Sequence, residues 1–179
     1  MGMNESSPSA GRSPAIVVMG VSGSGKTTVG EALAERFGLP LLEGDQFHPK
    51  ANIDKMSSGT PLTDEDRWPW LDAIAAAMRD APDGIIVTCS SLRRVYRDRL
   101  RERAGRPVLF VFLNGSRDTL ARRLAARKGH FMPASLLDSQ IATLEPPGAD
   151  EPGIVPVSFE PPVETVVKTA IEGVAAAMA

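Results

Sequence analysis

A glycine-rich stretch near the N-terminus carries the residues from which we expect nucleotide chemistry. GVSGSGKT (20–27) matches the pattern G-x-x-x-x-G-K-[ST] in full. Glycines let the backbone curl so that successive N–H groups point at an anion, and a following helix start adds partial positive charge. Lys26 can reach the β- and γ-phosphates, and the Thr27 hydroxyl can bind Mg²⁺. The sequence therefore predicts a site for ATP and Mg²⁺, formed by Gly20, Ser22, Gly23, Ser24, Gly25, Lys26, Thr27 and Thr28.

A second group of polar side chains begins at the end of the next short apolar run. A carboxylate at Asp45 can accept a hydroxyl proton or hold Mg²⁺ through water. A solvated turn aspartate is the alternative interpretation, because Gly44-Asp45 is also a turn sequence. His48, Lys55 and Arg67 follow and offer donors to a polar, anionic substrate. Arg67 is a candidate clamp, since a guanidinium can grip a carboxylate through two parallel hydrogen bonds.

The stretch from Arg93 to Arg106, with both ends included, contains seven arginines. Most such charge runs are a solvated helix face. We keep Arg93 and Arg94 as substrate-binding candidates because they follow the end of the third apolar run. We expect the later side chains of this helix to lie on the surface, namely those of Arg99, Arg101 and Arg103.

Arg123 and Arg127 lie four residues apart and share one face of a predicted helix. Such arginines can contact ATP and neutralise charge on a transferring phosphoryl group, whereas ion pairing on an exposed helix is the alternative. The segment that follows, residues 128–151, has the least regular pattern and the most glycine and proline. We expect it to act as a moving lid, with His130 and Gln140 as candidate substrate contacts.

Short apolar runs alternate with amphipathic stretches along the chain, which predicts a five-stranded parallel sheet with helices on both faces. Ligands of such sheets bind at the carboxyl ends of the strands. Residues 1–13 are expected to be a flexible tail and residues 14–179 a single domain. The predicted strands cover residues 15–20, 40–45, 84–90, 107–115 and 154–159. The predicted helices cover residues 27–38, 63–78, 92–103, 116–127, 133–144 and 161–178, with Thr63 and Asp66 as a capping box.

Composition points to an ordinary globular protein. Net charge is −2 over 179 residues, so we expect neither a nucleic-acid nor a membrane partner. The single cysteine, Cys89, lies in the apolar run IIVTCSS and is expected to be a buried core residue. One cysteine and no apolar stretch near 20 residues fit a cytoplasmic protein.

Three longer blocks resemble the signature blocks of the bacterial-type gluconate kinase family. They are GDQFHPKANIDKMSSGTPLTDEDRWPWL (44–71), CSSLRRVYRDRLR (89–101) and RKGHFMPASLLDSQIATLEPP (127–147). The resemblance implies a fold like that of nucleoside monophosphate kinases, a homodimer, and ATP-dependent phosphorylation of D-gluconate to 6-phosphogluconate. It also implies that the stretch from Arg123 to Phe131 closes over ATP. We take Lys26, Asp45 and Arg127 as the catalytic candidates, with Asp45 deprotonating the attacking 6-hydroxyl.

Two departures from the family pattern bear on Mg²⁺. Glu43 stands where the family often has aspartate, and the third strand ends in Thr88-Cys89-Ser90 without a metal-binding carboxylate. Mg²⁺ would then rely on Thr27, phosphate oxygens and water. Two alternatives stay open: a kinase for another small acceptor such as shikimate or a nucleoside monophosphate, and a regulatory protein that binds ATP and hydrolyses it slowly.

Overall fold

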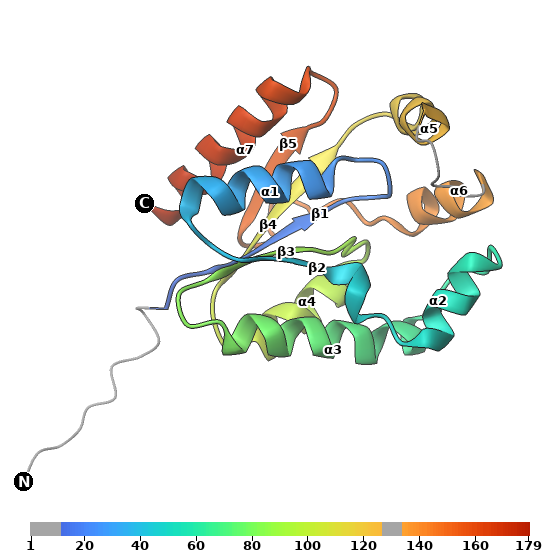
Figure 1. The fold of residues 1–179 in the computed structure, drawn as a ribbon, viewed down its shortest axis with the longest axis horizontal. Helices are drawn as coiled ribbons and strands as arrows, with labels where there is room; N and C mark the ends of the chain where they lie inside the picture. The colour runs from blue at the N-terminus through green and yellow to red at the C-terminus, as the bar shows by residue number, and fades with distance from the viewer. Residues whose placement is uncertain (1–11, 127–133) are drawn as a thin grey trace, which may run out of the picture.

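The computed structural model describes residues 12–126 and 134–179. Its centre is one parallel sheet in the order β2-β3-β1-β4-β5, which confirms the predicted fold class (Figure 1). The strands are β1 (Ala15–Met19), β2 (Leu41–Glu43), β3 (Ile85–Thr88), β4 (Val108–Asn114) and β5 (Ile154–Ser158).

The predicted helices are all present within the described residues, with small shifts at their ends. They are α1 (Lys26–Phe37), α3 (Asp64–Asp80), α4 (Arg94–Ala104), α5 (Arg117–Ala126), α6 (Ala134–Thr143) and α7 (Val163–Met178). Two further elements were not predicted: the 3-10 helix η1 (Gly44–Phe47) and the short helix α2 (Lys50–Ser57). The predicted capping box at the start of α3 is confirmed, because Thr63 Oγ1 accepts from Asp66 N and Asp66 Oδ2 accepts from Thr63 N.

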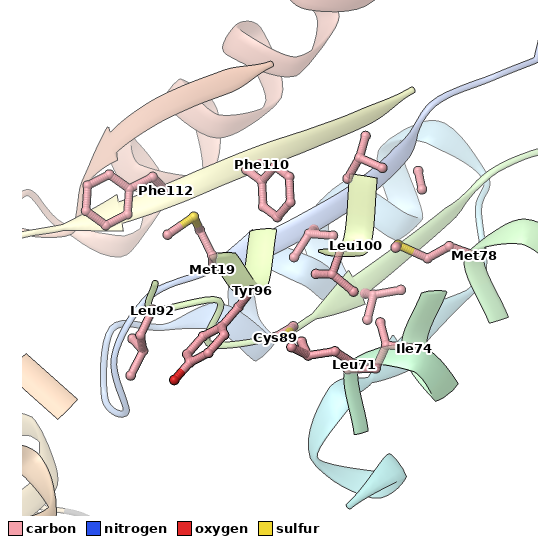
Figure 2. Packing of buried hydrophobic residues seen from close by; sticks show 14 of the residues in the cluster. Met19, Leu71, Ile74, Met78, Cys89, Leu92, Tyr96, Leu100, Phe110 and Phe112 are labelled. Carbon is pink, nitrogen blue, oxygen red and sulfur yellow. The ribbon is translucent and has the colours of Figure 1, made fainter. Parts of the chain in front are cut away.

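Two hydrophobic clusters lie on opposite faces of the sheet. Successive side chains of a strand point to opposite faces, so Val17 and Met19 enter one cluster while Ile16 and Val18 enter the other. Helices α1 and α7 cover the face of Ile16 and Val18, and α3 and α4 cover the opposite face (Figure 1). Figure 2 shows the cluster beneath α3 and α4, which includes Cys89, as predicted for a core cysteine.

The centre of the sheet determines where a ligand can bind. β1 is wholly buried and pairs with β3 on one side and with β4 on the other. The glycine-rich loop follows β1, so it lies at the middle of the carboxyl edge of the sheet, where open α/β sheets bind ligands. Helices α2, α5 and α6 lie at this same end of the molecule (Figure 1).

Both outer strands of the sheet have limited free edges. β2 is only three residues long. Just before β5, Gly153 O accepts from Phe110 N, and just after the strand Phe159 N donates to Asn114 O. Alternate residues of a strand bond to the same neighbour, so the odd-numbered residues of β5 face β4 and Pro156 faces outward.

Candidate active site

The backbone of the glycine-rich loop has a shape that only glycine adopts readily. Gly20, Gly23 and Gly25 have φ angles of 148°, 86° and 98°. A Cβ atom on Gly20 would lie 2.7 Å from Ser24 Oγ, and one on Gly23 would lie 3.2 Å from Leu124 Cγ. The loop is therefore a tight cradle that ends at the first residue of α1, as a phosphate-binding loop requires.

The cation of this loop lies inside the cradle. Lys26 Nζ donates to the carbonyl oxygens of Gly20 (2.9 Å) and Val21 (3.2 Å). Thr27 and Thr28 follow in the exposed first turn of α1. The cradle, its ammonium group and the two hydroxyls fit a triphosphate with Mg²⁺. Within residues 12–126 and 134–179, no group of three or more acidic, histidine or cysteine side chains is arranged to hold a metal. The metal would therefore depend largely on the phosphates.

A pocket of about 610 Å³ opens beside the loop, a size typical of small-molecule sites. It brings together predicted site residues from four parts of the chain: Ser22, Lys26, Asp45, His48, Arg67 and Gln140. Apolar side chains form much of the remaining wall, among them Ile53, Met56, Leu62, Trp70, Leu92 and Leu136. Nucleotide-binding and acceptor-binding candidates therefore share one cavity.

Asp45 reaches this pocket because the end of β2 is held tightly. Gly44 packs so closely against β3 that a Cβ atom would lie 2.1 Å from the carbonyl oxygen of Thr88. Trp70 Nε1 donates to Gly44 O (2.7 Å), and Gly44 N donates to Thr88 Oγ1 (3.3 Å). Thr88 Oγ1 in turn donates to Glu43 Oε2 (2.5 Å). These contacts fix the start of η1 and hence the position of Asp45.

His48 lies against Trp70, with ring centroids 4.1 Å apart and an interplanar angle of 15°. Burial lowers the pKa of His48, and the opposing effect of Asp45 does not cancel this. Asn52 Nδ2 donates to the backbone oxygen of Asp66 (2.9 Å) and lies 3.2 Å from His48 Nδ1. Nδ1 is therefore the acceptor of a neutral ring, which leaves the hydrogen on Nε2 as a donor.

Three predicted substrate contacts do not line the pocket. Each is engaged by an acidic partner instead: Lys55 Nζ lies 2.7 Å from Asp66 Oδ2, Arg93 NH1 lies 2.6 Å from Asp64 Oδ2, and Arg94 NH1 lies 2.8 Å from Asp150 Oδ2. Arg67 differs from them, because it lines the pocket and donates to the hydroxyl of Tyr96 (2.6 Å).

Arg123 lies against the phosphate-binding loop. Its NH2 donates to Phe159 O (2.6 Å), its guanidinium lies 5.0 Å from the Phe159 ring centroid, and its NH1 lies 3.5 Å from Gly23 O and 3.4 Å from Ser24 O. Arg127 and His130 lie outside the described residues.

Gln140 contacts the same loop from α6. Its Oε1 accepts from Ser22 N (2.8 Å) and its Nε2 donates to Ser22 Oγ (3.1 Å). This residue was predicted to contact the substrate, and it lines the pocket. The structure also gives it a two-point contact with the backbone and side chain of the phosphate-binding loop.

The basic helix α4 is less exposed than predicted. Arg97 is 1% exposed and forms a fork-shaped pair with Glu151, both distances being 2.8 Å. The prediction of a surface position is wrong for Arg101, whose side chain is 17% exposed and contacts Glu151 (3.1 Å). Burial raises the pKa of Glu151, but the hydrogen bonds from the two arginines outweigh it and leave the pKa lowered.

Sequence reasoning missed Trp70, Asn52 and Tyr96 as parts of this site. Trp70 lies in the block 44–71, and its place at an apolar position of α3 gave no sign of a polar contact. Asn52 belongs to a helix that was not predicted. Tyr96 is the only tyrosine of the chain and lies within the basic run. That position was the one feature of the sequence that could have indicated a role in the site.

The sheet order, the phosphate-binding loop after β1 and the pocket beside it define the class of P-loop kinases. A family model described as "AAA domain" matches residues 16–147. The chain belongs to the gluconokinase family, as its similarity to members from several organisms shows.

Three of these relatives span most of the chain. A gluconokinase of Gluconobacter oxydans (strain 621H) is 52% identical, over 87% of this chain and 88% of that protein. The thermoresistant gluconokinase of Escherichia coli (strain K12) is 46% identical, over 87% of this chain and 90% of that protein. The crystal structure of a gluconokinase from Sinorhizobium meliloti 1021 has a TM-score of 0.86 at 52% identity, covering 92% of this chain and 93% of that one.

Proposed function

We propose that the protein transfers the γ-phosphate of ATP to the 6-hydroxyl of D-gluconate, giving 6-phosphogluconate and ADP. The observation that carries this proposal is the shared pocket, where the lysine of the phosphate-binding loop, one carboxylate and one arginine line the same cavity. The relatives named as gluconokinases support gluconate as the acceptor.

The donor side of the reaction rests on the loop from Gly20 to Thr27. Its backbone N–H groups and the start of α1 bind phosphate oxygens, and Lys26 pairs with the β- and γ-phosphates. The Thr27 hydroxyl would hold Mg²⁺, which supplies charge neutralisation on the triphosphate when bound. Arg123 lies beside this loop, and we place it and Arg127 against the nucleotide and the transferring group.

The acceptor side rests on the other wall of the pocket. Arg67 binds the gluconate carboxylate, and the Nε2–H of His48 donates to a sugar hydroxyl. Asp45 orients the 6-hydroxyl and accepts its proton. The hydroxyl oxygen forms a bond to the γ-phosphorus while the bond from that phosphorus to the β–γ bridging oxygen breaks, and ADP leaves with that electron pair.

Further parts of the proposal go beyond the shared pocket. We place the enzyme in the cytoplasm as a homodimer, with no nucleic-acid or membrane partner. Among the described helices, none has the length and apolar character that a membrane crossing requires. The chain acts as one kinase domain, in which residues 128–151 contribute a lid. The far end of that segment is anchored, since Glu151 pairs with buried Arg97, so lid movement is confined to the part before it.

The alternatives have no specific observation in their favour. A shikimate or nucleoside monophosphate kinase would share the phosphate-binding loop, and a slow ATP-hydrolysing regulator would not need an acceptor pocket. A coupled assay of ADP release separates these cases. We expect turnover with gluconate well above that with shikimate or nucleoside monophosphates, and equal background rates with every acceptor would refute the proposal.

The role of Asp45 has its own test. Because a positioned general base contributes about 10²–10⁴-fold, Asp45→Asn should lower kcat by that factor with the KM for ATP nearly unchanged. Asp54→Asn is the matched control, since Asp54 is an exposed acid on α2 outside the pocket lining. A kcat for Asp45→Asn equal to that of the control would show that another group takes the proton.

A further inference from the structure

Arg67 is held by a phenol instead of a carboxylate. Its NH1 donates to Tyr96 Oη (2.6 Å), and its guanidinium lies 4.9 Å from the centroid of the same ring. Among residues 12–126 and 134–179, it forms no ion pair. Within these residues, the arginine that faces the pocket therefore has a neutral partner, and its charge is left for a ligand.

The carboxylate that contacts the Tyr96 hydroxyl is engaged by a second group. Asp64 Oδ2 accepts from Arg93 NH1 (2.6 Å), and Asp64 Oδ1 accepts from the hydroxyl of Tyr96. Arg93 is also 3.7 Å from Glu145. The Tyr96 hydrogen bond is the largest cause of the lowered pKa of Asp64, so this carboxylate stays ionised at neutral pH. Because the single phenol hydrogen goes to Asp64, the phenol oxygen must accept from Arg67.

The position of the phenol is fixed by the core. Tyr96 is 1% exposed, and its ring packs among apolar side chains between the sheet and α3. In Figure 2 the ring lies beside Leu92 and Cys89, with its oxygen at the rim of the cluster. A buried ring of this kind has little freedom to move, so its hydroxyl defines a fixed point for the guanidinium.

We propose that Tyr96 is a positioning residue, which holds the Arg67 guanidinium in the orientation that binds the carboxylate of the acceptor. Asp64 orients the phenol hydrogen, and Arg93 balances the charge of Asp64, so neither removes the positive charge of Arg67. This chain of contacts selects an aldonate, which carries a carboxylate, over a neutral polyol of the same length. The inference rests on the proposed function and adds to it a group outside the pocket lining.

Tyr96→Phe tests this inference, because it keeps the ring and deletes only the hydroxyl. We expect the KM for gluconate to rise by about tenfold or more, as for loss of a hydrogen bond to a charged group, while kcat and the KM for ATP change little. The matched control is Asp72→Asn. It breaks the contact of Asp72 with Arg99 (2.7 and 2.8 Å), which also joins α3 to α4 but lies outside the pocket lining.

A double-mutant cycle with Arg67→Gln shows whether Tyr96 acts through Arg67. If it does, Tyr96→Phe adds little to the loss of gluconate affinity already caused by Arg67→Gln, because the guanidinium that Tyr96 positions is absent. The dissociation constant of gluconate, measured by calorimetry, gives the same comparison where turnover is too slow. If the fold-increases in gluconate KM caused by the two single substitutions multiply in the double variant, the inference is overturned. An unchanged gluconate KM in Tyr96→Phe would overturn it as well. Lack of gluconate turnover by the wild-type protein would instead refute the proposed function itself.

Discussion

The pair formed by Arg97 and Glu151 yields the sharpest prediction on stability. Arg97 donates to both carboxylate oxygens of Glu151 at 2.8 Å, and each side chain is 1% exposed. The remaining N–H groups of Arg97 bond to the carbonyl oxygens of Ser91, Leu92 and Glu145. The pair therefore fastens α4 to the turn after β3 and to the segment after α6. Glu151→Gln keeps the shape of the side chain and leaves the guanidinium buried without a counter-charge.

The expected loss is large because the charge left behind is buried. Breaking a buried ion pair by removing one partner costs about 3–5 kcal/mol, out of a total stability of about 5–15 kcal/mol. For a chain of this size the loss lowers Tm by roughly 6–20 °C. Asp72→Asn is a matched control, since its partner Arg99 lies on the same helix as Arg97 and the two form an equally short fork with side chains 26% and 33% exposed. It should cost at most about 1 kcal/mol.

Urea unfolding followed by tryptophan fluorescence measures both variants, because Trp68 and Trp70 lie on α3. Equal losses in the two variants, or a loss below about 1 kcal/mol for Glu151→Gln, would refute the reasoning from burial. The pH dependence gives an independent check. The pKa of Glu151 is lowered from its ordinary value of 4.5 in the folded state. Its contribution is therefore complete above that pH and decreases as pH falls below it. The stability gap between the wild type and Glu151→Gln should narrow in acid.

Two further predictions concern the core and the end of β2. Gly44→Ala should lower both Tm and kcat, because its Cβ would lie 2.1 Å from Thr88 O and would displace η1. Gly38→Ala is the control, because a Cβ at that position would have no atom within 4 Å. It should cost only about 1–2 kcal/mol of stability, for its left-handed backbone. Equal effects would contradict this steric argument. Burial raises the pKa of Cys89 to about 11, so the thiol should resist a disulfide reagent at pH 8 in the folded protein and react fully in urea. Rapid reaction without denaturant would show that the thiol is accessible.

Features that depend on neighbouring residues were predicted well from the sequence. The loop from Gly20 to Thr27 leads into the first turn of α1 as expected, and the box formed by Thr63 and Asp66 caps α3. Both rest on contacts within a few residues. Short apolar runs likewise located the five strands. Burial on both faces explains the unbroken apolar sequences of the central strands β1 and β3. Helix α2 was not predicted, because Asn52 is its only buried residue and its sequence therefore has no apolar stripe.

Features that depend on distant partners could not be predicted in this way. A run of arginines has the same pattern whether its side chains meet water or a carboxylate fifty residues later, which is the case for Arg101 and Glu151. The pairing of Arg93 with Asp64 likewise depends on how α4 packs against α3. The sequence therefore indicated which residue types could bind an anion. The packing of the helices decides which of them reach the pocket: Arg67 lines it, whereas Lys55, Arg93 and Arg94 do not.

The short strand β2 and the outward-facing Pro156 of β5 have a consequence for concentrated solutions. A parallel sheet grows by adding strands at its edges, and each added strand needs a row of free N–H and C=O groups. Here one edge offers only three residues, and the other lacks an N–H donor at mid-strand. Neither edge is a template for another chain. The folded protein should therefore resist β-linked fibre formation even when crowded, and fibres would require prior unfolding of the sheet.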